Sequence, residues 1–264
     1  MTYVAPLLFT LFVWWFSTGV ILYLDGRPPR TFKWTMLGAT LLALLGFAGL
    51  RASSAIQSQA AAYCAFTCAL LIWAWQEVAF LLGMVTGPRR VACPPGTRGW
   101  RRALLAFQTV AHHELALVVL GAGVVAVTWG QPNRTGLWTF VILWAMRQSA
   151  KLNVFLGVRN LSEEFLPKHL SYLQTYFRRA RMNRLFPVAV ALATWLAVVV
   201  WQAALADDIQ VFEATTLTFA ATLLSLAILE HWFMVLPLPA TALWNWGLRS
   251  RAPPVADRLG TRPS

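Results

Sequence analysis

Long apolar stretches alternate along the chain with short polar or basic segments. Seven of the apolar stretches have roughly the 17–25 residues that an α-helix needs to cross the hydrocarbon core of a bilayer. We therefore expect an all-α integral membrane protein with seven transmembrane helices, forming a single polytopic membrane domain over residues 1–248. The predicted spans lie near residues 3–24, 34–50, 60–85, 103–128, 136–157, 185–205 and 213–236.

The composition supports this class. Hydrophobic residues make up 58% of the chain and charged residues only 12%, and the mean hydropathy is +0.57. A soluble domain of this length would need more polar surface. Residues 249–264, which are rich in proline and arginine, are expected to form a flexible cytoplasmic tail.

The basic residues predict the orientation of the spans. Of the 22 lysines and arginines, all but Arg51 and Arg134 fall on one side of the predicted membrane. Because lysine and arginine collect in cytoplasmic loops, we expect a periplasmic N-terminus and a cytoplasmic C-terminus. Topology and attraction to anionic membrane lipid also account for the net charge of +12, so nucleic acid is not an expected partner.

The long loop between the fifth and sixth spans has the pattern of an amphipathic helix near residues 162–184. Acidic residues follow Ser162, Pro167 suits an early helical position, and arginines lie near the end. We expect this helix to lie on the cytoplasmic membrane surface, either as a connector resting on lipid or as a docking surface for a partner. The residues of its apolar stripe, which would carry the docking, are Leu166, Leu170, Leu173 and Phe177.

A set of polar side chains falls within the predicted spans, at a similar depth in their cytoplasmic half. Glu77, His113 and Glu230 lie about 9–15 Å from the inner ends of three spans, at 1.5 Å per residue. Ionisable groups in a bilayer are costly unless they face the bundle interior and find partners. We therefore predict a buried polar cluster, with Gln108, His112 and His113 on the inward face of the fourth span. The predicted cluster comprises Glu77, Gln108, His112, His113, Glu114, Arg147, Gln148, Lys151, Asn153, Glu230 and His231.

Three interpretations of this cluster remain open. A charge network could tie the helices together without doing chemistry. A metal site could use Glu77, His112, His113, Glu230 and His231, although the Glu-x-x-His spacing of di-metal bundles is absent and nearby cations would repel a metal ion. A tetrapyrrole or quinone site could use a histidine as axial ligand or hydrogen-bond donor.

Four stretches carry a family resemblance. KLNVFLGVRNLSEEFLPKHLSYLQTYFRRARMNRLFPVAV over residues 151–190, WQEVAFLLG from Trp75, AHHELALV from Ala111 and ILEHWFMVLP from Ile228 resemble the PuhE family, the photosynthetic complex assembly protein 2 of purple phototrophic bacteria. The length and the number of spans are also similar.

The resemblance implies a multi-pass protein of the bacterial inner membrane, cytoplasmic or intracytoplasmic. It also implies an accessory factor for assembly of reaction-centre and light-harvesting complexes, which influences bacteriochlorophyll formation or delivery; whether the protein is also an enzyme stays open at this point. Its implied partners are membrane lipid and either photosynthetic complex subunits or pigment-biosynthesis proteins. The alternative is a membrane-embedded metal- or haem-dependent enzyme acting on a tetrapyrrole through the Glu/His layer. The sequence therefore leaves a metal ion or a tetrapyrrole as the candidate cofactor.

Overall fold

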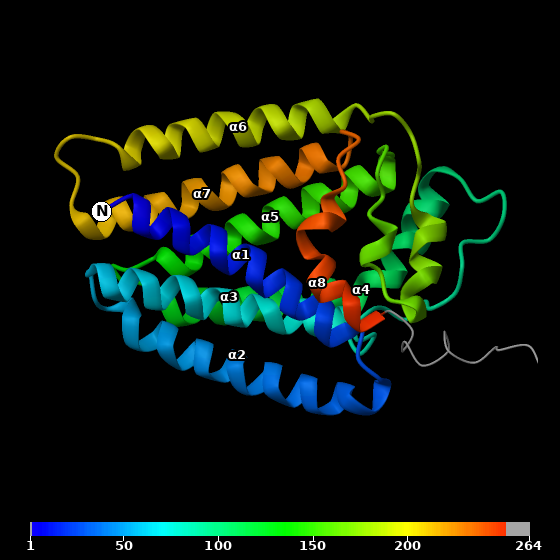
Figure 1. The fold of residues 1–264 in the computed structure, drawn as a ribbon, viewed down its shortest axis with the longest axis horizontal. Helices are drawn as coiled ribbons and strands as arrows, with labels where there is room; N and C mark the ends of the chain where they lie inside the picture. Colours follow the sequence, from blue (N-terminus) through cyan, green and yellow to red (C-terminus); the bar gives the residue numbers. More distant parts are fainter. Residues whose placement is uncertain (1, 252–264) are drawn as a thin grey trace, which may run out of the picture.

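The apolar stretches form long α-helices in the computed structural model, which describes residues 2–251 (Figure 1). Within that range the only β-type pairing is an isolated bridge between Val158 and Arg179. The protein is therefore all-α, as its sequence predicts. The long helices are α1 (Val4–Asp25), α2 (Phe32–Ser54), α3 (Gln59–Leu81), α4 (Gly99–Thr128), α5 (Thr135–Leu156), α6 (Leu185–Ala204) and α7 (Val211–Phe233).

Six of these helices are long and apolar enough to cross a membrane: α1 to α4, α6 and α7, with a 3-10 turn η1 (Pro29–Thr31) leading into α2. Helix α5 has 22 residues, which is sufficient length, but several polar side chains lower its apolar character. These helices support a multi-pass helical membrane protein. The seventh span, α5, and the orientation stay predictions.

Helices α3 and α7 form the centre of the bundle. In the most apolar stretch of the helix, 50% of the residues are buried within the protein in α3 and 56% in α7. The corresponding share is 17–22% in α1, α2, α4 and α6. Phe66 of α3 stacks on Phe219 of α7 with ring centroids 4.2 Å apart. The outer helices instead expose large apolar side chains, such as Leu45 of α2 and Leu192 of α6, which suit contact with lipid.

Three buried threonines of α7 form hydrogen bonds within their own helix. In α7 the hydroxyls of Thr215, Thr218 and Thr222 each donate to the carbonyl four residues earlier, at 2.7 Å. These bonds pair the three hydroxyl donors within the helix itself. The central helix can therefore carry polar residues and still pack on all sides.

The loop between α5 and α6 differs from the predicted amphipathic helix. It contains two separate 3-10 segments, η2 (Glu163–Phe165) and η3 (Lys168–Tyr176). Ser162 has a left-handed backbone (φ 52°), and the residue before Pro167 is extended, as proline favours for its predecessor. The prediction of a continuous helix over residues 162–184 was therefore wrong.

The apolar stripe of this loop packs inward. Leu170, Leu173 and Tyr176, spaced by three residues, are all buried, which matches the three-residue turn of a 3-10 helix. Leu170 and Leu173 pack with Phe80 at the end of α3, and Leu166 and Phe177 lie against the same cluster. The chain itself thus covers the predicted docking stripe, so these four side chains do not form a free docking surface.

The C-terminal end of the described chain folds back across α1. It consists of η4 (Ala240–Trp244), α8 (Asn245–Leu248) and η5 (Arg249–Arg251), which we call the strap, residues 240–251. In Figure 1 this segment runs beside the later half of α1. The predicted flexible tail 249–264 begins within the strap, and residues 252–264 lie outside the described part of the chain.

Candidate functional site

Helix α5 presents its polar residues to the neighbouring helices rather than to lipid. Arg147 Nη2 lies 2.6 Å from Glu77 Oε2 of α3. One turn later, Lys151 Nζ lies 2.5 Å from Glu114 Oε1 of α4. Gln148 donates to the other oxygen of Glu114 at 2.6 Å. These pairs explain how a helix with such a sequence can lie inside an apolar bundle.

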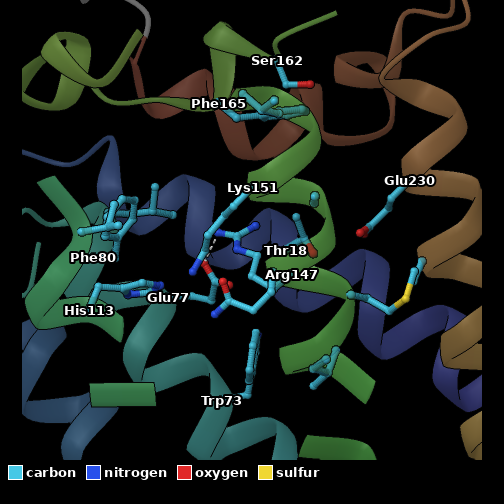
Figure 2. A pocket seen from close by; sticks show the side chains of 18 of the residues that line it. Thr18, Trp73, Glu77, Phe80, His113, Arg147, Lys151, Ser162, Phe165 and Glu230 are labelled. Atoms are coloured by element: carbon cyan, nitrogen blue, oxygen red, sulfur yellow. Dashed lines mark hydrogen bonds and ion pairs between the residues drawn. The ribbon is translucent and has the colours of Figure 1, made fainter. Parts of the chain in front are cut away.

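A third carboxylate has a different environment. Glu230 of α7 accepts a hydrogen bond of 2.6 Å from the indole N–H of Trp14 on α1. Among the described residues it forms no ion pair. In Figure 2 its carboxylate points into the open space between the helices. Glu230 is therefore an acid whose single protein partner is neutral.

His113 of α4 is almost completely buried, with 1% of its surface exposed. Its ring packs on Phe80 with centroids 4.6 Å apart. Its Nδ1 has no hydrogen-bond partner within the part of the chain that the structure describes. A buried polar atom without a partner is unusual in a native protein and calls for an explanation.

All these groups line one cavity of about 790 Å³ (Figure 2). Its size lies in the range of sites for drug-sized and larger organic molecules. Helices α1, α3, α4, α5 and α7 contribute to its wall, together with the loop after α5 and the strap. Of the predicted cluster, the cavity is lined by Glu77, His113, Glu114, Arg147, Gln148, Lys151 and Glu230.

The other four predicted residues do not line the cavity. His112 is exposed on another face of α4, so the expectation that it faces inward with His113 was wrong, and Gln108 is only half-buried. His231 shares a hydrogen bond of 2.9 Å with Ser149 of α5 and one of 2.8 Å with the Ala227 carbonyl. Asn153 accepts hydrogen bonds from Asn183, whose own side-chain oxygen accepts from the first amides of α6.

The metal interpretation depends on Glu77, His112, His113, Glu230 and His231 forming one ligand set. Within residues 2–251, no three side chains of the His, Cys, Asp and Glu types group so that they could hold a metal ion. Glu77 is bonded to Arg147 and His231 to Ser149, so both are already engaged. The geometry thus supports a ligand chamber better than a metal centre.

Aromatic side chains form much of the chamber wall, and the sequence analysis did not assign them to the site. They include Trp14, Trp73, Phe165 and Trp244. Aromatic residues inside spans are usually packing residues. The sequence signal was their number: the chain has 14 tryptophans and 16 phenylalanines. Only the fold shows which of them face the cavity.

The strap closes one side of the cavity. The ring of Trp244 meets Trp14 at 5.1 Å and Phe165 at 5.8 Å, both edge-to-face. At the end of the strap, Arg251 Nη2 lies 2.6 Å from Oδ1 of the buried Asp25, and the same guanidinium donates to the carbonyls of Glu164 and Phe165. Arg251 therefore ties the strap to both α1 and the loop after α5.

The sequence profile of the family described as "Protein of unknown function (DUF3623)" matches residues 1–255. A protein of Rhodobacter capsulatus, described as "Uncharacterized 30.4 kDa protein in puhA 5'region", is 41% identical over 247 residues, which cover 91% of this chain and 89% of the relative. No solved structure matches the chain.

Proposed function

The chain belongs to the DUF3623 family, and from that premise we propose that it is an accessory factor for assembly of photosynthetic complexes. The name of the R. capsulatus relative places it in the 5′ region of puhA. That position fits the resemblance of this chain to the PuhE family. It also fits a protein of the photosynthesis gene cluster.

The proposed working site is the cavity. It lies among five helices, has an aromatic wall, and contains a layer of ionisable side chains in an otherwise apolar interior. A purely structural charge network would need no empty volume, because interiors are normally close-packed. The observation that carries the proposal is the space of about 790 Å³ beside Glu230 and His113. We propose that this space holds a hydrophobic ligand of the tetrapyrrole class, whose formation or delivery the protein assists.

The proposed topology has seven spans, including α5, with the N-terminus periplasmic and the C-terminus cytoplasmic, in the bacterial inner membrane. The interhelical pairs of Arg147 and Lys151 support α5 as a span, since both charges are compensated by carboxylates of its neighbours. The strap and the loop after α5 would then face the cytoplasm, where photosynthetic complex subunits or pigment-biosynthesis proteins would have access to them.

A gene deletion in the native phototrophic host tests this function. We expect membranes of the deletion strain to show a reduced absorbance of reaction-centre and light-harvesting complexes. The wild-type gene should restore it, whereas Ala74→Trp, which places a large ring in the cavity wall, should not. Ala191→Trp, on the exposed face of α6, is the matched control and should restore it. Unchanged pigment and complex levels in the deletion strain would rule out the proposal.

A further inference from the structure

The charges of the cavity do not balance. Its wall carries three carboxylates, those of Glu77, Glu114 and Glu230, and two basic side chains, those of Arg147 and Lys151. Both basic groups are already paired with the first two carboxylates, at 2.6 and 2.5 Å. With His113 neutral and all three carboxylates ionised, the wall has one negative charge in excess, on Glu230, the carboxylate without a basic partner.

The position of this excess charge restricts what can bind. A carboxylate in a weakly polar interior repels another anion much more strongly than it would in water. Conversely, it favours a cation or a hydrogen-bond donor, because one of its oxygens has only the Trp14 indole as a partner. An anionic ligand would find a positive partner only at Arg147 or Lys151, each of which already has a carboxylate at ion-pair distance.

The shape of the wall restricts the ligand further. Eleven aromatic side chains line the cavity, among them Trp73, Phe80 and Trp244. Aromatic rings pack on other rings in stacked or edge-to-face geometry, so such a wall favours a flat conjugated molecule over a flexible acyl chain.

His113 gives an independent indication of a ligand. Its side chain is 1% exposed and lines the cavity, and its Nδ1 lacks a partner within residues 2–251. In Figure 2 the imidazole extends from α4 toward the Glu77–Arg147 pair, with Glu230 drawn on the other side of that pair. The cavity thus offers polar groups with unused hydrogen-bonding capacity on three helices: His113 on α4, Nε of Arg147 on α5 and Glu230 on α7.

We propose that the cavity selects its planar ligand by charge: it binds a neutral or cationic ring system, with a hydrogen-bond donor held by Glu230, and rejects the anionic form of the same ring. This inference rests on the proposed ligand chamber and adds the ligand's polarity. It assigns Glu230 as the residue that determines specificity, and it excludes ligands with free carboxylate or phosphate groups inside the cavity.

The test compares two probes with the same ring, mesoporphyrin dimethyl ester and mesoporphyrin diacid, whose two propionate groups are neutral in the ester and ionised in the diacid. The full-length protein is placed in phosphatidylcholine nanodiscs, and the shift of the porphyrin absorption band is titrated, with empty nanodiscs subtracted. We expect the wild type to bind the ester at least about tenfold more tightly than the diacid.

Two variants test whether Glu230 is responsible for the selectivity. In Glu230→Gln the ratio of the two affinities should fall to near one, chiefly because the diacid now binds. Glu213→Gln removes the same charge from an exposed position at the start of the same helix, outside the cavity, and should keep the wild-type ratio. If Glu230→Gln does not fold, Trp14→Phe provides the test, since it keeps the charge and removes its partner, and the ratio should then be at least as large.

The outcomes separate the two proposals. Equal binding of ester and diacid by the wild type, or an unchanged ratio in Glu230→Gln, would overturn the charge selection. Binding of neither probe above empty nanodiscs would overturn the planar-ligand inference as a whole. The role in complex assembly would still be decided separately, by the deletion strain.

Discussion

Trp14 of α1 donates its indole N–H to Glu230 of α7 at 2.6 Å, so the first and last long helices meet at the acid that faces the cavity. Trp14 also packs edge-to-face on Trp244 of the strap. The same tryptophan therefore connects the candidate ligand site to the segment that covers it.

The ion pair between Glu77 and Arg147 should stabilise the bundle. Either Glu77→Gln or Arg147→Met leaves one charge without its partner, and we expect a loss of about 1–2 kcal/mol in unfolding free energy. This is less than the 3–5 kcal/mol of fully buried pairs, because the Arg147 side chain is 39% exposed. The double variant should recover about 1 kcal/mol of the summed loss. Unfolding in detergent, followed by circular dichroism, measures this, and strictly additive losses would contradict the coupling.

Helix α5 should cross the membrane. In a cysteine-free background we expect Gln131→Cys, just before α5, and Lys168→Cys, in the loop after it, to react with an impermeant maleimide from opposite faces. Intact cells expose one face of the membrane to the reagent, and inverted vesicles expose the other. Labelling of both positions from one face would show that α5 does not cross and that the count is six.

His231 and His113 should respond differently to substitution. His231 joins α7 to α5 through Ser149, so His231→Phe should cost about 1–2 kcal/mol of stability while porphyrin-ester binding persists. His113→Phe removes a side chain whose Nδ1 has no partner in the described chain, so stability should hold while ester binding weakens. Thermal unfolding and the nanodisc titration together check this, and the reverse pattern would exchange the two roles.

The strap should be held in place by close backbone packing on α1. A Cβ atom on Gly247 would lie 2.4 Å from the Gly19 carbonyl oxygen, so Gly247→Val should detach the strap. We expect faster hydrogen–deuterium exchange over residues 240–251 in this variant. Gly38→Ala is the control, because nothing lies within 4 Å of the added atom, and it should leave the exchange of the strap unchanged.

Much of the helical framework could be predicted because the length of an apolar stretch alone determines whether it can span a bilayer. The predicted 60–85 helix ends early, at Leu81, because Gly83 takes a positive φ (74°) just after it. The loop after α5 could not be predicted. The spacings of four, three and four residues between Leu166, Leu170, Leu173 and Phe177 favour an α-helix, whereas the buried residues Leu170, Leu173 and Tyr176 recur every three residues, as in a 3-10 helix. The packing of Leu170 and Leu173 on Phe80 depends on the fold and could not be read from this spacing.

The sequence predicted how deep in the membrane the site residues lie, but not which way their side chains point. Similar depth brings Glu77, Glu114 and Arg147 into one layer, and the structure pairs acids with bases there. Adjacent residues on a helix point about 100° apart, so the sequence could not tell His113 from His112. That choice depends on the rotation of α4 in the bundle. The aromatic wall was missed for the same reason, since lipid-facing and cavity-facing tryptophans have the same local pattern.

The most direct test of the central claim, that the cavity is a ligand chamber, is the absorption spectrum of the protein gently solubilised from its native membrane, with Ala74→Trp and Ala191→Trp prepared in parallel. We predict that the wild type and Ala191→Trp carry a tetrapyrrole absorption band in near-stoichiometric amount, and that Ala74→Trp, folded to the same extent, lacks it. A colourless wild-type protein, or a band that persists in Ala74→Trp, would contradict the account.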